Sequence, residues 1–262
     1  MNTEEKAPLI VHLIELRNRL MVSVLAVLVG FLGCYFFAEE IFEFLVEPLR
    51  AASGEELKMV YTGLAEAFFT YMKVAFFAGL FLAMPLIIYQ FWAFVAPGLY
   101  RHERRAVLPF LLVAPLLFFA GGGLAYQFVF PPAFKFFLAF ATPFIEPLLS
   151  LREYLSLVIT LIFAFGMSFE LPVIMLLLIR VGVLSTEALI KKRKYSIILA
   201  FVIGGILTPP DPFTQSMLAV PLLAMYEISI FLGKRIERAR EKREEENQTD
   251  EDDLEEAEDP PR

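Results

Sequence analysis

Apolar residues form several runs long enough to cross a lipid bilayer. A transmembrane helix rises about 1.5 Å per residue and needs about 20 apolar residues to cross a hydrocarbon core about 30 Å thick. Four runs are close to or above that length, at residues 20–38, 67–95, 106–130 and 154–179. They predict four membrane-spanning helices.

Two further apolar runs predict a hairpin of short helices. Residues 195–207 offer only 13 positions before the sequence Thr-Pro-Pro-Asp-Pro at 208–212. Proline lacks an N–H and clashes with the preceding turn, so the helix must stop there. Residues 213–232 follow as a sixth run. We therefore expect an all-α integral membrane protein with six transmembrane helices, of which the fifth and sixth are short and thin the bilayer locally.

The segments between the first runs predict a cap on one membrane surface. Glu39, Glu43 and Glu47 repeat every four residues, and an apolar face lies opposite them. This pattern is typical of an amphipathic helix in the membrane interface, and we expect it to end near Pro48. The dipeptide at 131–132, two prolines before several phenylalanines, predicts a second interfacial piece.

The distribution of charge predicts the orientation. Of 23 lysines and arginines, 18 lie in residues 1–19, 96–105, 180–194 and 233–262, which are on one side of the predicted spans. Cytoplasmic segments of membrane proteins carry an excess of these residues, so both termini are expected in the cytoplasm. The other side, with the cap, is then the outer side of the membrane.

The last 30 residues differ in composition from the rest. They hold 13 acidic and 7 basic side chains, which is most of the net charge of −7. We expect a membrane domain at 1–234 and a charged tail at 235–262, disordered after Glu244. Because no basic domain remains, nucleic-acid binding is not expected.

The residues needed for several kinds of catalysis are missing. There are two histidines, His12 and His102, one cysteine, and no GxxxxGK[ST] phosphate-binding sequence. Zinc, haem and P-loop chemistry therefore lack ligands. We expect no catalytic residues, no metal and no cofactor, and the protein is not expected to be an enzyme.

Two carboxylates lie inside apolar runs. A charge near the centre of a membrane helix costs roughly 2.5–3.5 kcal/mol, so Glu170 is expected to meet protein or water. It is either a polar or proton-sensitive contact in a cavity or a structural hydrogen bond between helices, and we expect it to face an accessible concave surface. Glu227, nearer the end of its run, is expected to be a charge that either snorkels to the interface or is paired with another charge, more than a ligand.

Two dense motifs lie on the predicted cytoplasmic face. HLIELRNRL at 12–20 places Glu15 and Arg19 four residues apart on one helix face. The second motif, FVAPGLYRHERR at 94–105, contains Glu103. Carboxylates accept paired hydrogen bonds from a guanidinium, so Glu15 and Glu103 are candidates for binding a cationic ligand.

These motifs resemble the TatC family, the core subunit of the twin-arginine protein translocase. The resemblance covers residues 7–234 and is carried by HLIELRNRL, YQFWAFVAPGLYRHERR, AFGMSFELPV and LTPPDPFTQ, in that order. It implies a six-helix protein of the bacterial inner membrane that binds the twin-arginine signals of folded precursors. Transport in the family uses the proton motive force, and the implied partners are TatA- and TatB-type single-span subunits and other TatC copies.

The resemblance also implies roles for particular residues. The signal-binding residues are implied to be Glu15, Arg17, Arg19, Phe94, Pro97, Glu103 and Arg105. The others are the intramembrane Glu170, the periplasmic Pro48 and Asp211, and the partner-docking Thr208 and Gln215. The chain departs from the family pattern at the glycine pair 204–205, which lacks bulk beside the docking patch.

Two other functions fit parts of the sequence. A small-solute or proton-coupled transporter would use Glu170, but such proteins show internal repeats, which the chain lacks. A purely structural membrane subunit would not require carboxylates clustered on the inner face. The first hypothesis is therefore a receptor and assembly platform for protein export.

Overall fold

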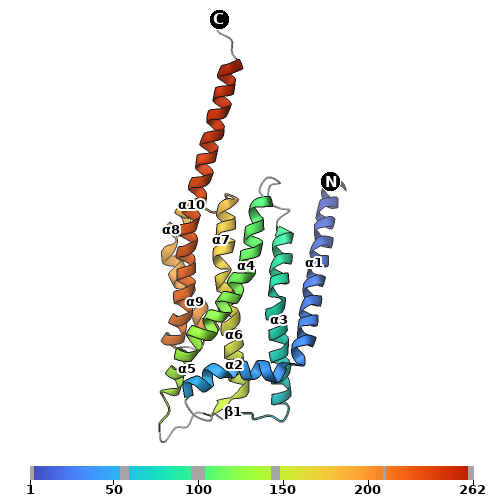
Figure 1. The fold of residues 1–262 in the computed structure, drawn as a ribbon, viewed down its shortest axis with the longest axis vertical. Coiled ribbons are helices and arrows are strands. Elements are labelled where there is room, and N and C mark those ends of the chain that lie inside the picture. Colours follow the sequence, from blue (N-terminus) through green and yellow to red (C-terminus); the bar gives the residue numbers. More distant parts are fainter. Residues whose placement is uncertain (1–2, 54–58, 96–103, 143–147, 209–210, 259–262) are drawn as a thin grey trace.

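The computed structural model describes residues 3–53, 59–95, 104–142, 148–208 and 211–258. The elements are α1 (Thr3–Tyr35), α2 (Ala38–Ser53), β1 (Met59–Val60), α3 (Glu66–Val95), α4 (Arg104–Leu124), the π-helix η2 (Ala125–Val129), α5 (Phe130–Leu138), β2 (Leu149–Ser150), α6 (Leu151–Phe169), α7 (Leu171–Arg180), α8 (Thr186–Lys191), α9 (Arg193–Leu207) and α10 (Pro212–Glu258). Most helices run between two ends of the molecule, and the start of α1 and the end of α10 lie at the same end (Figure 1). We call this the terminal end, and the opposite one the cap end.

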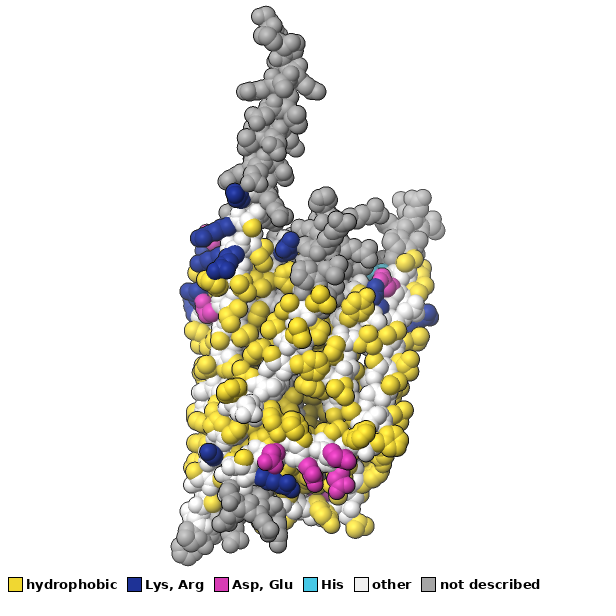
Figure 2. Space-filling view, viewed as in Figure 1, with side chains coloured by type: hydrophobic (Ala, Val, Ile, Leu, Met, Phe, Trp, Pro, Cys, Tyr) yellow, Lys and Arg dark blue, Asp and Glu magenta, His cyan; other side chains and the backbone are white. Residues whose placement is uncertain are grey.

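Five segments in the described residues are long and apolar enough to cross a membrane. They are Ile10–Tyr35, Glu66–Phe94, Leu112–Leu138, Leu151–Arg180 and Pro212–Ala239. The space-filling view shows a broad hydrophobic band between charged groups at the two ends (Figure 2). The chain is therefore a multi-pass membrane protein, as the apolar runs predict.

The predicted fifth helix is short. It is α9, with 15 residues, which is less than the about 20 needed to cross the bilayer core. The predicted sixth helix is not short, because α10 continues for 47 residues from the apolar segment into the charged tail. Once Pro221 is passed, no proline or glycine except Gly233 interrupts it before Glu258, and Glu, Lys and Arg are good helix formers. The functional division near residue 234 stays a prediction.

The predicted fourth span is divided into α6 and α7 at Glu170. Pro172 lies in the first turn of α7, where its missing N–H is tolerated. In a continuous helix that N–H would bond to the carbonyl of Ser168, so the proline removes one helical hydrogen bond beside Glu170. The two helices continue in nearly the same direction (Figure 1).

The third span differs from its prediction in the opposite way, because the helical chain continues past residue 130. The two prolines at 131–132 do not open a separate interfacial segment. Instead α4 continues through η2 directly into α5, whose first turn accommodates both prolines. Helix α5 lies at the cap end (Figure 1).

Helix α2 lies across the cap end, roughly perpendicular to the spans (Figure 1). Its buried side includes Leu45, Val46 and Leu49, and its glutamates are exposed, as the amphipathic pattern predicts. It does not end near Pro48 but continues to Ser53. Hydrogen bonds from other helices hold α2 together across this proline.

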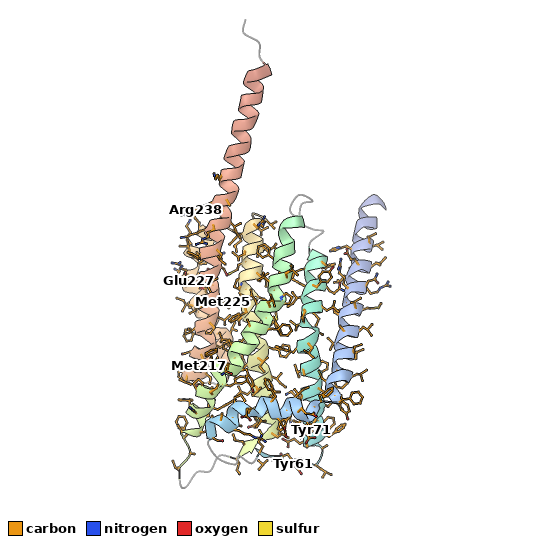
Figure 3. The ribbon with its side chains drawn as sticks, in the orientation of Figure 1. Tyr61, Tyr71, Met217, Met225, Glu227 and Arg238 are labelled. Atoms are coloured by element: carbon orange, nitrogen blue, oxygen red, sulfur yellow. The ribbon has the colours of Figure 1, made fainter. Side chains whose placement is uncertain are left out.

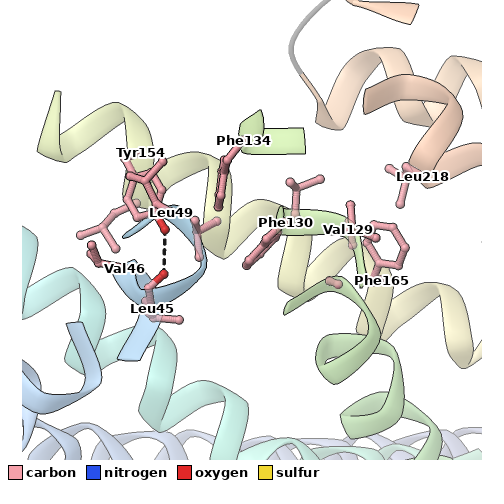
Figure 4. Packing of buried hydrophobic residues seen from close by; sticks show 14 of the residues in the cluster. Leu45, Val46, Leu49, Val129, Phe130, Phe134, Tyr154, Phe165 and Leu218 are labelled. Atoms are coloured by element: carbon pink, nitrogen blue, oxygen red, sulfur yellow. Dashed lines mark hydrogen bonds between the residues drawn. The ribbon is translucent and has the colours of Figure 1, made fainter. Parts of the chain in front are cut away.

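The main hydrophobic core lies beneath α2, where α5, α6 and α10 converge. Phe130, Phe165 and Leu218 are fully buried in it (Figure 4). Strands β1 and β2 pair in parallel next to this core, with Met59 opposite Leu149. The core therefore fixes the cap end of the molecule.

Helix α1 packs mainly against α3 through a close backbone contact. A Cβ added at Gly79 would lie 2.3 Å from the amide nitrogen of Phe31 and 2.5 Å from the carbonyl carbon of Gly30. Small residues let two membrane helices approach to this distance. Glycine is therefore required at position 79 for α1 to dock on α3.

Candidate functional site

The carboxylate of Glu15 is the centre of a polar cluster at the terminal end. Arg19, one helical turn later on α1, donates to Oε1 of Glu15 from Nη2 at 2.6 Å and from Nε at 3.0 Å. The Nη1 atom of Arg19 donates to Oε1 of Gln90 on α3 at 3.1 Å. Arg19 thus ties Glu15 to α3, and both its side chain and that of Glu15 are partly exposed.

An aromatic pair borders this cluster. The ring of His12 stacks on the ring of Phe94 with centroids 4.2 Å apart. The Nδ1 atom of His12 lies 3.8 Å from Oε2 of Glu15, the oxygen that Arg19 does not use. We call His12, Glu15, Arg19, Gln90 and Phe94 the Glu15 cluster.

The structure brings together some of the predicted signal-binding residues but not all. Glu15, Arg19 and Phe94 meet in the Glu15 cluster, whereas Arg17 is exposed and donates to the Asn18 side chain at 3.0 Å. Pro97 and Glu103 lie outside the described residues, and so does the side chain of Arg105. Their place in a signal site stays a prediction.

Glu170 is placed differently from its expectation. Its side chain is only 5% exposed, so it does not face an accessible concave surface. Within the described part of the chain, its Oε1 atom has no hydrogen-bond partner. A buried carboxyl oxygen without a partner is costly, and the break between α6 and α7 lies at this residue.

Asp211 caps the first turn of α10. Its Oδ1 atom accepts from the backbone N–H of Thr214 at 2.8 Å and of Phe213 at 3.1 Å, and its Oδ2 atom accepts from the Thr214 hydroxyl. These backbone groups have no partner within the helix. The predicted periplasmic residue Asp211 thus holds the start of α10 at the cap end.

The predicted docking residues are engaged within the α9–α10 hairpin. Thr208 is buried, and its hydroxyl donates to the carbonyl of Gly204 at 2.9 Å. Gln215 donates from Nε2 to the carbonyl of Phe201 at 2.7 Å. A Cβ at Gly204 or Gly205 would lie 3.1 Å from atoms of Gln215, so the glycine pair makes room for this side chain.

Pro48 is buried within α2 and leaves a backbone carbonyl without its helical partner. In a regular helix the N–H of residue 48 would bond to the carbonyl of Phe44. Instead, the Tyr126 hydroxyl donates to that carbonyl at 2.8 Å. The Tyr154 hydroxyl donates to the neighbouring Leu45 carbonyl at 2.7 Å (Figure 4). Two tyrosines from η2 and α6 therefore stabilise α2 at its proline.

Glu227 on α10 is paired, which is one of the two alternatives expected for it. Its Oε2 atom lies 2.7 Å from Nη2 of Arg193 at the start of α9, and both side chains are about half exposed. Glu227 lies in the first third of α10, between Met225 and Arg238 (Figure 3). The ion pair therefore joins the two helices of the hairpin away from their turn.

Sequence reasoning missed several of these contacts. Gln90 precedes Phe94 by four residues in the same motif, so helical periodicity alone places both on one face. Tyr126 and Tyr154 gave no comparable signal, because the carbonyls that they bond lie 82 and 109 residues away in the sequence. Such partners are visible only in the folded chain.

Comparisons with known proteins agree with this architecture. The family model described as "Sec-independent protein translocase protein (TatC)" matches residues 11–221. A protein of that name from Magnetococcus marinus is 65% identical over 93% of this chain and 90% of its own length. The Escherichia coli K12 protein of the same name is 44% identical over 89% of this chain and 91% of its own length.

A solved structure gives the same result. The crystal structure titled "Twin Arginine Translocase Receptor- TatC" aligns with a TM-score of 0.77 at 43% identity. The alignment covers 86% of this chain and 99% of the crystallised one. Family model, relatives and fold agree over most of the chain, and the chain belongs to the TatC family.

Proposed function

We propose that the chain is the receptor and core subunit of a Sec-independent translocase that binds twin-arginine signals. The main observation in support is the Glu15 cluster. It places a partly exposed carboxylate at the terminal end, beside the aromatic ring of Phe94 and the polar side chain of Gln90. Relatives named as translocase proteins and a solved structure titled as a receptor support this over a small-solute transporter or a purely structural subunit.

The geometry of Glu15 fits recognition of a guanidinium. Arg19 donates to the Oε1 atom of Glu15. The other carboxylate oxygen, Oε2, lies 3.8 Å from Nδ1 of His12, which is longer than a hydrogen bond. An incoming arginine can therefore bond to Oε2 directly, or take both oxygens if Arg19 turns toward Gln90 alone. Lysine lacks the planar fork of arginine, so a twin-lysine signal binds more weakly.

The remaining signal-binding residues complete the proposal. Glu103 supplies a second carboxylate, and Arg17, Phe94, Pro97 and Arg105 support the signal on the same face. In this orientation both termini are cytoplasmic, the protein lies in the bacterial inner membrane with a sixth span at α9, and α2 faces the periplasm. Residues 235–262 form a separate cytoplasmic tail.

The proposed partner subunits bind toward the cap end of the molecule. TatA- and TatB-type single-span subunits dock at the α9–α10 hairpin, near Thr208 and Gln215, and further TatC copies join the complex. Gln215 already contacts α9, which makes the hairpin one rigid surface for a partner helix. Transport of folded precursors then draws on the proton motive force.

Signal-peptide binding to membranes that contain each variant tests the proposal. Glu15→Gln keeps the shape of the side chain and removes its charge. A charged hydrogen bond is worth roughly 1.5–3 kcal/mol, so binding should weaken by about ten- to hundredfold. Glu39→Gln, an exposed glutamate on α2 at the cap end, is the matched control and should bind as the parent does.

Glu103→Gln provides the second arm of the same experiment. The proposal expects Glu15→Gln and Glu103→Gln each to weaken binding of the twin-arginine signal more than that of a twin-lysine signal. Membrane levels of each variant are measured alongside. Binding of the twin-arginine signal by both variants as tightly as by the parent would refute the assignment.

A further inference from the structure

A polar pocket of about 490 Å³ opens at the cap end, apart from the Glu15 cluster. It lies between the turn after β1, the first turns of α3 and the start of α6, and its lining includes Glu66, Lys73 and Arg152. The neighbouring Tyr61 marks this region at the cap end (Figure 3). None of the residues proposed for signal binding or partner docking lines it.

The charges of this pocket leave an excess of positive groups. Glu66 is occupied, because its Oε2 atom accepts from the backbone N–H groups of Thr62 at 2.8 Å and Gly63 at 3.1 Å. Lys73 and Arg152 form no ion pair within the described ranges of the chain. Because Glu66 keeps its negative charge, the lining has a net charge of one positive unit, which favours an anion in a hollow at the membrane surface.

Lys73 also lines a second, largely apolar groove of about 590 Å³. This groove follows α6 from Ser156 to Ser168 and is bordered by Phe77 of α3 and Ile203 of α9. Twelve residues of helix correspond to about 18 Å. The polar pocket and the apolar groove therefore meet at Lys73, and the groove leads from the cap end into the membrane.

We propose that this pocket and groove together bind one anionic phospholipid. Its phosphate lies between Lys73 and Arg152, and one acyl chain follows the groove along α6. The pocket is polar at the membrane surface and the groove is apolar within the bilayer, which matches the headgroup and acyl chain of a phospholipid. A free phosphate has no apolar part that could fill the groove. The α3 lysine extends its apolar stem along the wall and its ammonium toward the surface. The inference does not depend on signal binding.

Native mass spectrometry of the full-length protein in detergent, titrated with phosphatidylglycerol or phosphatidylcholine, tests the inference. The parent should retain phosphatidylglycerol in preference to phosphatidylcholine. The double variant Lys73→Gln/Arg152→Gln should bind phosphatidylglycerol about tenfold more weakly. Lys135→Gln removes an exposed charge of α5 outside the pocket and should bind like the parent.

Two further variants separate charge, groove and folding. The exchange Lys73→Arg/Arg152→Lys keeps both charges and should restore binding, which excludes misfolding as the cause of the loss. Thr160→Phe places a ring in the groove and should weaken binding of phosphatidylglycerol. Inorganic phosphate at millimolar concentration should not displace the lipid.

A photo-crosslinking residue at Thr160 identifies the occupant in native membranes. Attachment of a phospholipid supports the inference, whereas attachment of protein segments alone overturns it and assigns the groove to a partner helix. Equal retention of the two lipids by the parent also overturns it, as does unchanged phosphatidylglycerol binding by Lys73→Gln/Arg152→Gln. Displacement of the lipid by inorganic phosphate would assign the pocket to free anions instead.

Discussion

The two ends of the molecule are held together by different interactions. At the terminal end the prominent contacts are ion pairs between partly exposed side chains, Glu15 with Arg19 and Arg193 with Glu227. Among the described residues the cap end has no ion pair, and its side chains bond to backbone groups, as Tyr226 also does with the Leu189 carbonyl nearer the terminal end. Tyr154 bonds to the Leu45 carbonyl, and Asp211 accepts from the first N–H groups of α10.

This difference matches a difference in burial and in proposed role. The helices that carry these contacts also differ in burial: 6% of the α1 span, which contains Glu15 and Arg19, is buried, against 56% of the Leu151–Arg180 span, which contains Tyr154. Exposed ion pairs contribute about 0–1 kcal/mol, whereas a buried backbone group left without a partner costs about 1–3 kcal/mol. The ion pair on the exposed helix α1 can therefore rearrange around a ligand at little cost, while the buried hydrogen bond between α6 and α2 provides stable support.

The substitution Gly79→Ala should lower stability the most, because it separates α1 from α3. The new Cβ would lie 2.3 Å from a backbone atom of α1, which cannot move aside as a flexible side chain can. Overpacking of this kind costs about 1–3 kcal/mol, and the backbone contact places Gly79→Ala at the upper end. The measurement is thermal unfolding of the purified protein, followed by size-exclusion chromatography.

Gly33→Ala is the matched control for this prediction. Among the described residues, no atom other than those of its chain neighbours and its own helix backbone lies within 4 Å of a Cβ at Gly33, and alanine favours a helix over glycine by up to about 1 kcal/mol. Gly33→Ala should therefore leave stability unchanged or raise it slightly. Equal stability of Gly79→Ala and the parent would show that α1 does not dock through this contact.

Tyr154→Phe should lower stability by about 0.5–1.5 kcal/mol, because it removes a buried hydrogen bond to the Leu45 carbonyl. Tyr126→Phe should cost less, since its hydrogen bond to the Phe44 carbonyl is exposed and water can replace it. Chemical unfolding in detergent measures both. A larger loss for Tyr126→Phe than for Tyr154→Phe would show that burial does not set the strength of these two hydrogen bonds.

Asp211→Ala should lower stability by about 1 kcal/mol, because the start of α10 loses its cap. Asp211→Asn keeps an acceptor oxygen and should recover most of that loss. Hydrogen exchange of the first amides of α10 checks the position of the effect. Slow exchange at Phe213 and Thr214 in Asp211→Ala would show that another group caps the helix.

The smallest effect is expected at the terminal end, for the pair of Arg193 and Glu227. A double-mutant cycle with Arg193→Ala and Glu227→Ala should give a coupling of about 0.2–1 kcal/mol that falls at high salt. Thermal unfolding at two salt concentrations measures it. A coupling as large as the effect of Tyr154→Phe would remove the contrast between the two ends.

Much of the architecture follows from the sequence. Long apolar runs predict the spans, and the run of 13 residues before the proline turn predicts the short α9. The resemblance carried by motifs such as HLIELRNRL implies the family that the comparisons confirm. The predicted end of α2 at Pro48 is wrong, because the tyrosines that stabilise its backbone come from distant parts of the chain.

For the candidate site, the sequence indicates which residues are polar and which pair within one helix, but not how deeply each side chain is buried. The spacing of Glu15 and Arg19 indicates their ion pair, since it is set by one turn of a single helix. The burial of Glu170 was not predictable, because the packing around it depends on how several helices meet.

By itself the sequence determined which segments lie in the membrane and which family the chain joins, since both depend on local composition and short motifs. Only the tertiary structure decided which polar groups have a hydrogen-bond partner and which have none. It paired the Tyr126 and Tyr154 hydroxyls with carbonyls of α2, and it buried Glu170 without a partner for Oε1 among the described residues. It also placed Lys73 and Arg152 in one pocket. The physical reason is that hydrophobicity acts on each segment alone, whereas a hydrogen bond or ion pair needs two groups that only the folded chain brings within about 3 Å.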